Sequence, residues 1–215
     1  MPLIIFDLDN TLVDRAAVFR SWAEGFAREH GLDERQCVSW FVEADADGVR
    51  PRPVLFEAAR GRFGLRESVE DLVAGWWPAY LSLYTCSGDT RDALTLLRRR
   101  GWRIGIATNG HAEQEDKIRQ AGLDVLVDGW CVSSIAGCAK PDARIFELAA
   151  ARCGATLKGA WMVGDSGPAD IGGAVAAGIR SAWISRGAAW TEAAYRPTIV
   201  TDSVGDAVRT ILATL

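Results

Sequence analysis

The sequence predicts an α/β protein: a mostly parallel sheet flanked by helices, with a helical segment inserted after the first strand. From Thr90 onward, buried strand patterns alternate with helical patterns across short joints marked by glycine, which is typical of a parallel sheet covered by helices. In residues 15–86 the apolar residues recur at helical spacing, without an alternating strand pattern. The apolar run Leu3–Phe6 precedes this stretch. We therefore expect residues 1–14 and 87–215 to form one discontinuous α/β domain, and residues 15–86 to form a helical domain.

The helical domain is predicted from the spacing of its apolar residues. Val18, Trp22 and Phe26 lie four residues apart, which places them on one face of a helix. The charged, proline-containing stretch from Asp45 to Pro53 is typical of a connection between helices. We therefore expect several helices joined by short polar connections.

The elements of the α/β domain follow in order from periodicity and from turn residues. Leu3–Phe6 is a short buried strand. Gly101 ends a helix at Arg91–Arg100, and the run Trp102–Thr108 is a second buried strand. The elements expected after it are, in order, a polar helix at about Ala112–Ala121, a short apolar run at Asp124–Val127, an extended stretch at Trp130–Ser133, a helix opened by Pro141 and reaching about Cys153, a strand at Ala160–Val163, a small-residue helix at Ala169–Ala177 and a strand at Ser181–Ile184.

Composition restricts the classes of function. The net charge of −4 over 215 residues offers no basic surface for nucleic acid or for an anionic membrane. No run approaches the roughly 18 apolar residues that a membrane span needs. The five cysteines are dispersed and form no Cys-x-x-Cys pair, which argues against a disulfide framework and a zinc knuckle. We expect a cytoplasmic protein, a monomer or homodimer, without nucleic-acid or membrane partners.

Two carboxylates follow the first strand. Asp7 and Asp9 are two positions apart, so in an extended chain their side chains project to the same side. Two neighbouring carboxylates repel each other unless a bound cation or a proton reduces their negative charge. An isolated pair of this kind also fits a solvated strand end or a helix cap. The rest of the chain must therefore decide between a site and a turn.

Further polar groups stand where other strands end. Ligands collect at the carboxyl ends of the strands in an open parallel sheet. Thr108-Asn109-Gly110 ends the second strand, and Lys140 precedes a predicted helix. Gly164-Asp165-Ser166 ends a later strand, with Asp170 five residues beyond Asp165. These groups and the first carboxylate pair are therefore expected to lie at one edge of the sheet.

The chain resembles the haloacid dehalogenase superfamily of hydrolases. The resemblance covers essentially the whole chain and rests on four groups in the order of that family: Asp7-x-Asp9-x-Thr11, then Thr108, then Lys140-Pro141-Asp142, then Gly164-Asp165 with Asp170. It implies a Rossmann-like sheet of strand order 5-4-1-2-3 with a helical cap inserted after strand 1. One departure is Ala169, because the family usually has Asn before the second acid.

The resemblance also implies an activity. Asp7 would attack phosphorus and form an aspartyl phosphate, while Asp9 would protonate the leaving oxygen and then deprotonate the attacking water. Mg²⁺ would be held by Asp7, Asp165 and the backbone carbonyl of Asp9, with Asp170 as a second acidic support. Lys140, Thr108 and the backbone amide of Asn109 would bind the phosphate. The sequence therefore predicts a magnesium-dependent phosphatase.

Asp9 separates the alternatives within the family. Family dehalogenases lack a carboxylate at this position, whereas phosphatases and phosphomutases have one, so a phosphomutase stays open. A phospho-accepting receiver-like domain is the alternative from another class. The expected substrate is a small phosphorylated metabolite, with nucleoside and sugar monophosphates favoured by the resemblance. Arg15, Arg50 and Arg52 are candidate contacts for an anionic leaving group, and each also fits a solvated or core position.

Overall fold

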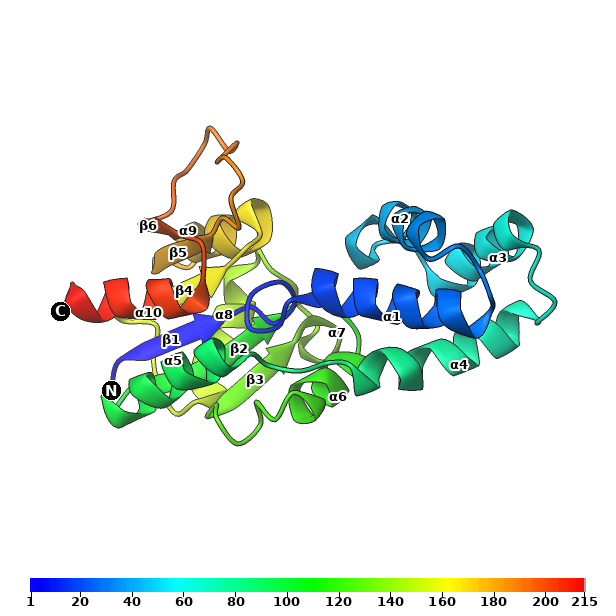
Figure 1. The fold of residues 1–215 in the computed structure, drawn as a ribbon. Coiled ribbons are helices and arrows are strands. Elements are labelled where there is room, and N and C mark those ends of the chain that lie inside the picture. Colours follow the sequence, from blue (N-terminus) through cyan, green and yellow to red (C-terminus); the bar gives the residue numbers. More distant parts are fainter. Residues whose placement is uncertain (215) are drawn as a thin grey trace. The chain divides into compact units, whose positions relative to one another are not determined.

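The computed structural model describes residues 1–214 and divides the chain into two compact units (Figure 1). The core unit consists of Met1–Val13 and Thr85–Leu215, and the helical unit is Asp14–Tyr84. Among the described residues, no helix has the length and apolar character needed to cross a membrane.

The core unit is built on one parallel sheet. Its order is β3-β2-β1-β4-β5-β6, and every neighbouring pair is parallel. The predicted order is confirmed for the first five strands, and the sequence did not predict the sixth, which extends the sheet beside β5. The strands are β1 (Leu3–Phe6), β2 (Arg103–Thr108), β3 (Gly129–Val132), β4 (Trp161–Gly164), β5 (Arg180–Ile184) and β6 (Ile199–Thr201).

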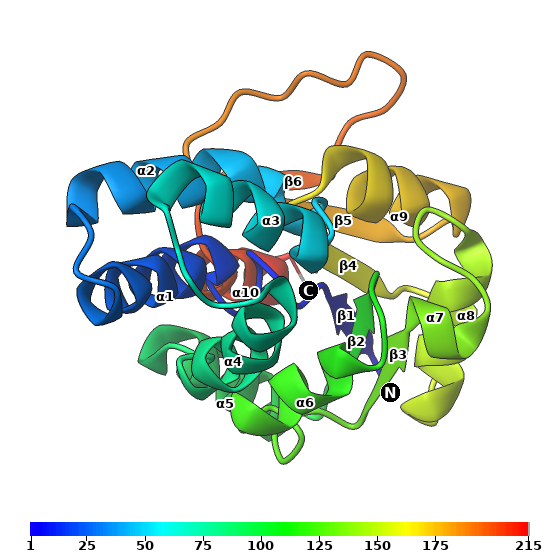
Figure 2. The same cartoon turned by 90° about the vertical axis from the view of Figure 1, so that its right-hand side faces the viewer.

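Helices cover both faces of this sheet (Figure 2). On one face α5 (Gly88–Arg99) packs against α10 (Val204–Ala213), and on the other α8 (Ala143–Arg152) lies beside α9 (Gly172–Ala176). The shorter helices α6 (Glu113–Gln120) and α7 (Ser133–Ala136) follow β2 and β3. The predicted fold class, a parallel sheet flanked by helices, is therefore confirmed.

Strand β1 lies in the middle of the sheet and carries the first acidic pair. All four of its side chains are buried, as expected for a strand covered on both faces. The Asp7 amide continues the pairing by donating to the Val163 carbonyl at 2.9 Å. Asp7 therefore follows the central strand at the carboxyl edge of the sheet.

Two predicted helices begin differently from what the sequence suggests. Pro141 lies before the first turn of α8, because the Asp142 side chain caps that helix by accepting from the Arg144 amide. The predicted helix Ala169–Ala177 begins instead as a π-helical turn, Gly167–Ile171, which leads into α9. Its wide turn arises because the Ser166 carbonyl accepts from the amides four and five residues on.

The helical unit contains four α-helices and one 3₁₀ turn within residues 14–84. A cluster of aromatic rings, with Trp22 near its centre, fills its interior; Phe26, Phe41 and Phe56 surround that indole at 5.1–5.9 Å between ring centroids. The elements are α1 (Arg15–Glu29), α2 (Glu34–Asp45), η1 (Ala46–Gly48), α3 (Arg52–Phe63) and α4 (Val69–Ser82).

A buried ion cluster ties these helices together. Asp45, 2% exposed, accepts from Arg15 at 2.6 Å and from Arg52 at 2.5 Å. The Arg52 guanidinium also lies over the Trp76 ring, 4.4 Å from its centroid. Two of the three candidate arginines are thus engaged within the helical unit. Their contacts explain why the helix ends meet at Asp45.

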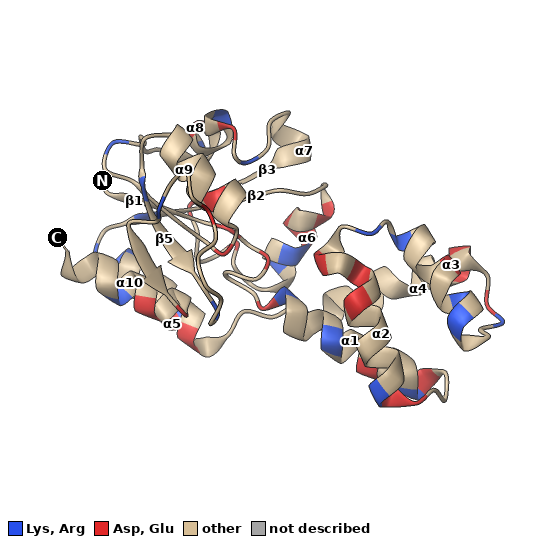
Figure 3. Cartoon of the chain, turned by 90° about the horizontal axis from the view of Figure 1, so that it is seen from above, with Lys and Arg blue, Asp and Glu red and all other residues tan. Residues whose placement is uncertain are grey.

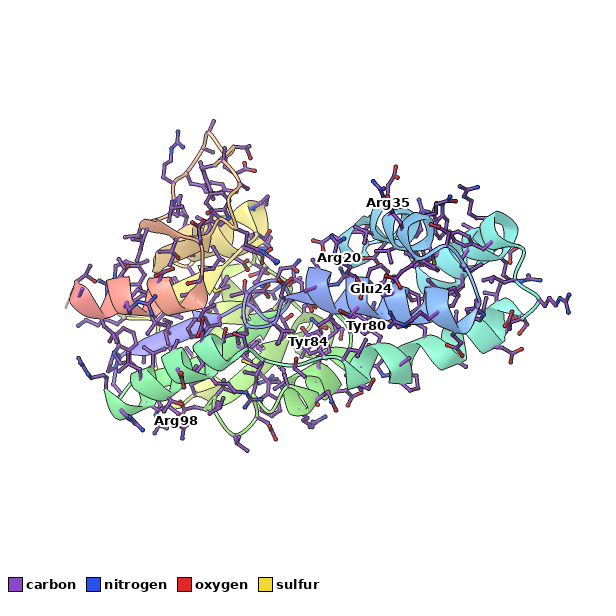
Figure 4. The ribbon with its side chains drawn as sticks, viewed as in Figure 1. Arg20, Glu24, Arg35, Tyr80, Tyr84 and Arg98 are labelled. Atoms are coloured by element: carbon purple, nitrogen blue, oxygen red, sulfur yellow. The ribbon has the colours of Figure 1, made fainter. Side chains whose placement is uncertain are left out.

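Charged side chains lie along a groove on the surface of the helical unit. Arg20 and Glu24 of α1 and Arg35 of α2 line an open groove of about 750 Å³ (Figure 4). Basic and acidic segments are interspersed along the helices of both units (Figure 3). This mixed pattern is typical of solvated helix faces.

Candidate active site at the carboxyl edge of the sheet

A single lysine bridges two buried carboxylates at the carboxyl end of β1. Lys140 Nζ lies 2.5 Å from Asp7 Oδ1 and 2.6 Å from Asp170 Oδ1. All three residues are buried, and Asp170 is completely so. Because a buried charge is stable only when paired and hydrogen-bonded, both carboxylates depend on Lys140, and the lysine depends on them.

The loop that carries Lys140 is fixed by Asn109. The Asn109 side chain donates to the Lys140 carbonyl at 2.9 Å and accepts from the Lys140 amide at 2.8 Å. The segment after β2 is thereby locked to the segment before α8. The side chain of Asn109 positions the lysine, while its backbone amide stays the predicted phosphate donor.

Asp170 reaches the site because Gly164 has no side chain. A Cβ on Gly164 would lie 2.2 Å from Asp170 Oδ2, which is closer than any real contact. The same oxygen accepts from the Ser166 amide at 2.9 Å. Both oxygens of Asp170 are therefore engaged, one with Ser166 and the other with Lys140.

Asp165 is held from its side chain and from its backbone. The Thr11 hydroxyl donates to Asp165 Oδ1 at 3.1 Å, and the Trp183 indole N–H donates to the Asp165 carbonyl at 2.6 Å. Trp183 in turn packs edge-on against Trp190, with ring centroids 4.9 Å apart. The loop after β4 is thus braced by an aromatic pair on β5 and the segment that follows it.

The crowding of these acids changes their protonation. Burial, with the repulsion of Asp170, raises the pKa of Asp7 to about 7, although Lys140 opposes the shift. Burial and the charge of Asp7 raise the pKa of Asp165 to about 6. Burial also raises the pKa of Asp170. Burial alone would lower the pKa of Lys140, but the two carboxylates outweigh it and raise that pKa.

Three aspartates, Asp7, Asp165 and Asp170, form an acid group with the composition of a site for a hard divalent cation. Asp7, Asp165 and Asp170 each offer a carboxylate oxygen, and these atoms lie within 4.8 Å of one another. Three carboxylates face one ammonium, so negative charge remains uncompensated in a buried place. Carboxylate oxygens are the ligands that Mg²⁺ prefers. The residues therefore fit such an ion, and the Asp9 side chain lies outside this group.

Asp9 turns its side chain toward α6. Its Oδ2 accepts from Lys117 Nζ at 2.7 Å and from Gln114 Nε2 at 3.0 Å. The same Gln114 nitrogen donates to Thr108 Oγ1 at 2.8 Å. The structure thus connects Asp9 to Thr108 through one amide.

The predicted site residues come together in two adjoining clusters. One cluster consists of Asp7, Lys140, Asp165 and Asp170. The other consists of Asp9 and Thr108, linked through α6.

Sequence reasoning assigned no role to four residues that contact these clusters. They are Thr11, Gln114, Lys117 and Trp183. Lys117 had a signal, because the chain has only three lysines. Gln114 and Lys117 are also spaced three residues apart, which places them on one face of a helix.

Known proteins resemble this chain in sequence and in fold. The sequence profile of the haloacid dehalogenase-like hydrolases matches residues 1–178. The chain is 35% identical to a phosphoserine phosphatase of Thermus thermophilus, over 87% of this chain and 90% of that one. It is 29% identical to a glyceraldehyde 3-phosphate phosphatase of Pyrococcus abyssi, over 87% and 82%. The HAD-hydrolase YfnB of Bacillus subtilis, crystallised bound to magnesium, superposes with a TM-score of 0.76 at 19% identity, covering 98% of each chain.

Proposed function

The chain belongs to the haloacid dehalogenase-like hydrolases and is a phosphoric monoester hydrolase, and on that premise we propose that it is a magnesium-dependent phosphatase of small phosphorylated metabolites. The observation that carries the proposal is the convergence of Asp7, Lys140 and Asp165 at the end of β1, with Asp9 two residues beyond the proposed nucleophile. The family membership decides against the receiver-like alternative.

In the first step Asp7 acts as the nucleophile. One of its carboxylate oxygens forms a bond to phosphorus while the bond from phosphorus to the leaving oxygen breaks. Asp9 gives its proton to that leaving oxygen, which departs as an alcohol. Lys140 stabilises the negative charge of the phosphoryl oxygens, and the Thr108 hydroxyl donates a hydrogen bond to one of them.

In the second step water releases the phosphate. Asp9, now ionised, takes a proton from the water as its oxygen bonds to phosphorus, and the bond to Asp7 breaks. Inorganic phosphate leaves, Asp7 is again a carboxylate, and Asp9 is again protonated. The two proton transfers balance, so the enzyme returns to its starting state.

A divalent cation would be held by Asp7 and Asp165, with Asp170 as support and the Asp9 carbonyl as a further oxygen ligand. When bound, it would neutralise negative charge on the phosphoryl group and on the crowded acids. We propose Mg²⁺ because every donor in the group is a hard oxygen.

Several features of the biological role stay proposals. We propose that the helical unit is the cap that the resemblance implies and that it selects the leaving group. We propose that the protein acts in the cytoplasm as a monomer or homodimer, on the basis of its five dispersed cysteines and acidic composition.

A release assay tests the proposed function. Phosphate release is measured with Mg²⁺ and with a chelator, for the wild type, for Asp7→Asn, and for Asp124→Asn as an exposed control of the same chemistry. We expect turnover that requires Mg²⁺, loss of at least about a thousandfold in Asp7→Asn, and unchanged turnover in the control. Retained turnover in Asp7→Asn would contradict the mechanism.

The substrates in that assay separate the remaining classes. The panel contains phosphoserine, glyceraldehyde 3-phosphate, nucleoside monophosphates and sugar monophosphates. Release of phosphate from monophosphates alone supports a phosphatase. A requirement for an added bisphosphate, with transfer of the phosphoryl group to a second hydroxyl, would support the phosphomutase instead.

A further inference from the structure

The side chain of Gln114 stands between the proposed proton donor and a proposed phosphate ligand. Its Nε2 lies 3.0 Å from Asp9 Oδ2, 2.8 Å from Thr108 Oγ1 and 3.5 Å from the Asn109 carbonyl. Gln114 is 5% exposed, so water competes little for these contacts. Asp9 Oδ2 accepts a hydrogen bond here, which fixes the nitrogen end of the amide toward Asp9.

The two hydrogens of the Gln114 amide determine how the Thr108 hydroxyl is oriented. An amide nitrogen has two hydrogens, and here one is directed to Asp9 and the other to Thr108. Because the Thr108 oxygen accepts this bond, its own hydroxyl hydrogen must point to another acceptor. That orientation leaves Thr108 a donor, as a ligand of a phosphoryl oxygen must be.

Lys117 completes the contact from the next turn of α6. Its ammonium lies 2.7 Å from the same Asp9 oxygen that accepts from Gln114. Both Lys117 and Gln114 are buried, and they lie on one face of the helix. Two donors of α6 therefore meet at one oxygen of Asp9.

The chain makes room for this arrangement at Gly110. A Cβ there would lie 2.8 Å from Cγ of Gln114, and the residue has a φ of +153°. Gly110 thus allows the Gln114 side chain to pass close to the backbone after β2. The Gly110 amide is itself fixed by the Ser133 hydroxyl at 2.9 Å.

We propose that Gln114 and Lys117 are positioning residues, which hold Asp9 for proton transfer and, through Gln114, keep Thr108 oriented as a phosphate donor. This inference rests on the proposed phosphatase function. The residues act through others: neither bonds to phosphorus or to the leaving oxygen. Lys117 contacts Asp9, whereas Gln114 contacts both Asp9 and Thr108.

This division of roles predicts different responses to the leaving group. Departure of 4-nitrophenolate needs little protonation, whereas phenolate, a much stronger base, departs more slowly without an acid. The two esters, 4-nitrophenyl phosphate and phenyl phosphate, share one phosphoryl group and nearly one shape. The measured quantity is kcat/KM, which reports steps up to the formation of the aspartyl phosphate.

Loss of Lys117 is expected to affect only the ester that needs the proton. In Lys117→Met, kcat/KM falls about ten- to a hundredfold for phenyl phosphate and less than about threefold for 4-nitrophenyl phosphate. Lys117→Arg keeps the positive charge and restores most of the loss. In an Asp9→Asn background, Lys117→Met adds no further loss, because the group it positions can no longer transfer a proton.

Loss of Gln114 is expected to affect both esters. In Gln114→Leu, kcat/KM falls for 4-nitrophenyl phosphate through Thr108, and falls further for phenyl phosphate through Asp9. Arg119→Met removes a cation from the exposed side of the same helix, where Arg119 pairs with Glu115, and leaves both values unchanged. Thermal unfolding of each variant shows whether the fold is intact.

The results separate this inference from the proposed function. An equal fall for both esters in Lys117→Met, or further loss in the Asp9→Asn background, would overturn the positioning role while leaving the phosphatase intact. Absence of turnover in the wild type with either ester, together with no effect of Asp7→Asn on the metabolite panel, would overturn the phosphatase itself.

Discussion

Lys140 Nζ contacts Asp7 Oδ1 at 2.5 Å, although 133 residues separate the two in the sequence. The contact joins the central strand to the loop before α8. It also places a positive charge beside the proposed nucleophile in a buried environment, where charges act strongly on each other. The same ammonium also contacts Asp170, so both buried carboxylates depend on this one lysine.

Removal of this ammonium is expected to destabilise the fold. In Lys140→Met the two carboxylates lose their partner, and the free energy of unfolding falls by about 3–5 kcal/mol at neutral pH. Urea unfolding of wild type and variant measures the difference. Lys158→Met, at an exposed lysine, is the matched control and should change stability by less than about 0.5 kcal/mol. Equal stability of the two variants would show that the buried cluster does not need the lysine.

The raised acid pKa values give the metal-free protein a pH dependence of defined sign. The pKa of Asp7 is about 7 and that of Asp165 about 6, against an ordinary value of 3.8. An acid with a higher pKa in the folded chain holds its proton more tightly there. Its stabilising effect is present below about pH 4 and is lost as pH rises through the folded value.

We therefore expect the free energy of unfolding in chelator to fall by on the order of 3 kcal/mol between about pH 5 and pH 8. Urea titrations at several pH values measure this fall. Added Mg²⁺ should reverse it, because the cation binds the ionised acids. Asp165→Asn should flatten the profile, and a wild-type profile that rises with pH would contradict the sign.

The sheet could be predicted because its signals are local. β1 and β2 are short apolar runs ended by polar turn residues, and parallel strands bring those ends to one edge whatever the intervening chain does. The π-helical turn at Gly167–Ile171 could not be predicted in this way. It depends on how Ser166 and Asp170 pair after folding, and the local sequence reads as an ordinary helix of small residues.

The site could be predicted for residues whose chemistry is distinctive, such as Asp7 and Lys140. Gln114 has no distinctive chemistry in the sequence, and its role arises only where α6 brings it within reach of Asp9 and Thr108. Trp183 illustrates the same limit, because an indole in an apolar strand reads as core until its N–H is seen to meet the Asp165 carbonyl.

Trp183 provides a test of how the loop after β4 is held. In Trp183→Phe a smaller aromatic ring replaces the indole, and the hydrogen bond to the Asp165 carbonyl is lost. The Asp165 loop is then less well oriented. We expect Mg²⁺ to bind about tenfold more weakly, as measured by calorimetric titration. Trp161→Phe is the matched control, since the Trp161 indole N–H has no hydrogen-bond partner within residues 1–214. Equal weakening in both variants would assign the effect to packing instead of the hydrogen bond.

Gly164→Ala should disrupt the acid group by displacing the Asp170 side chain. The added Cβ would lie 2.2 Å from Asp170 Oδ2 and 2.6 Å from Asp170 Cβ, so either the Asp170 side chain or the loop must move. Because Asp170 is completely buried and bonded to Lys140 and Ser166, we expect a loss of about 3 kcal/mol in the free energy of unfolding, together with weaker Mg²⁺ binding. Gly25→Ala makes the same change in the middle of α1, where the new Cβ meets open space, and should leave stability unchanged or raise it by up to about 1 kcal/mol. Urea unfolding measures both variants, and a neutral Gly164→Ala would show that Asp170 can leave its place without cost.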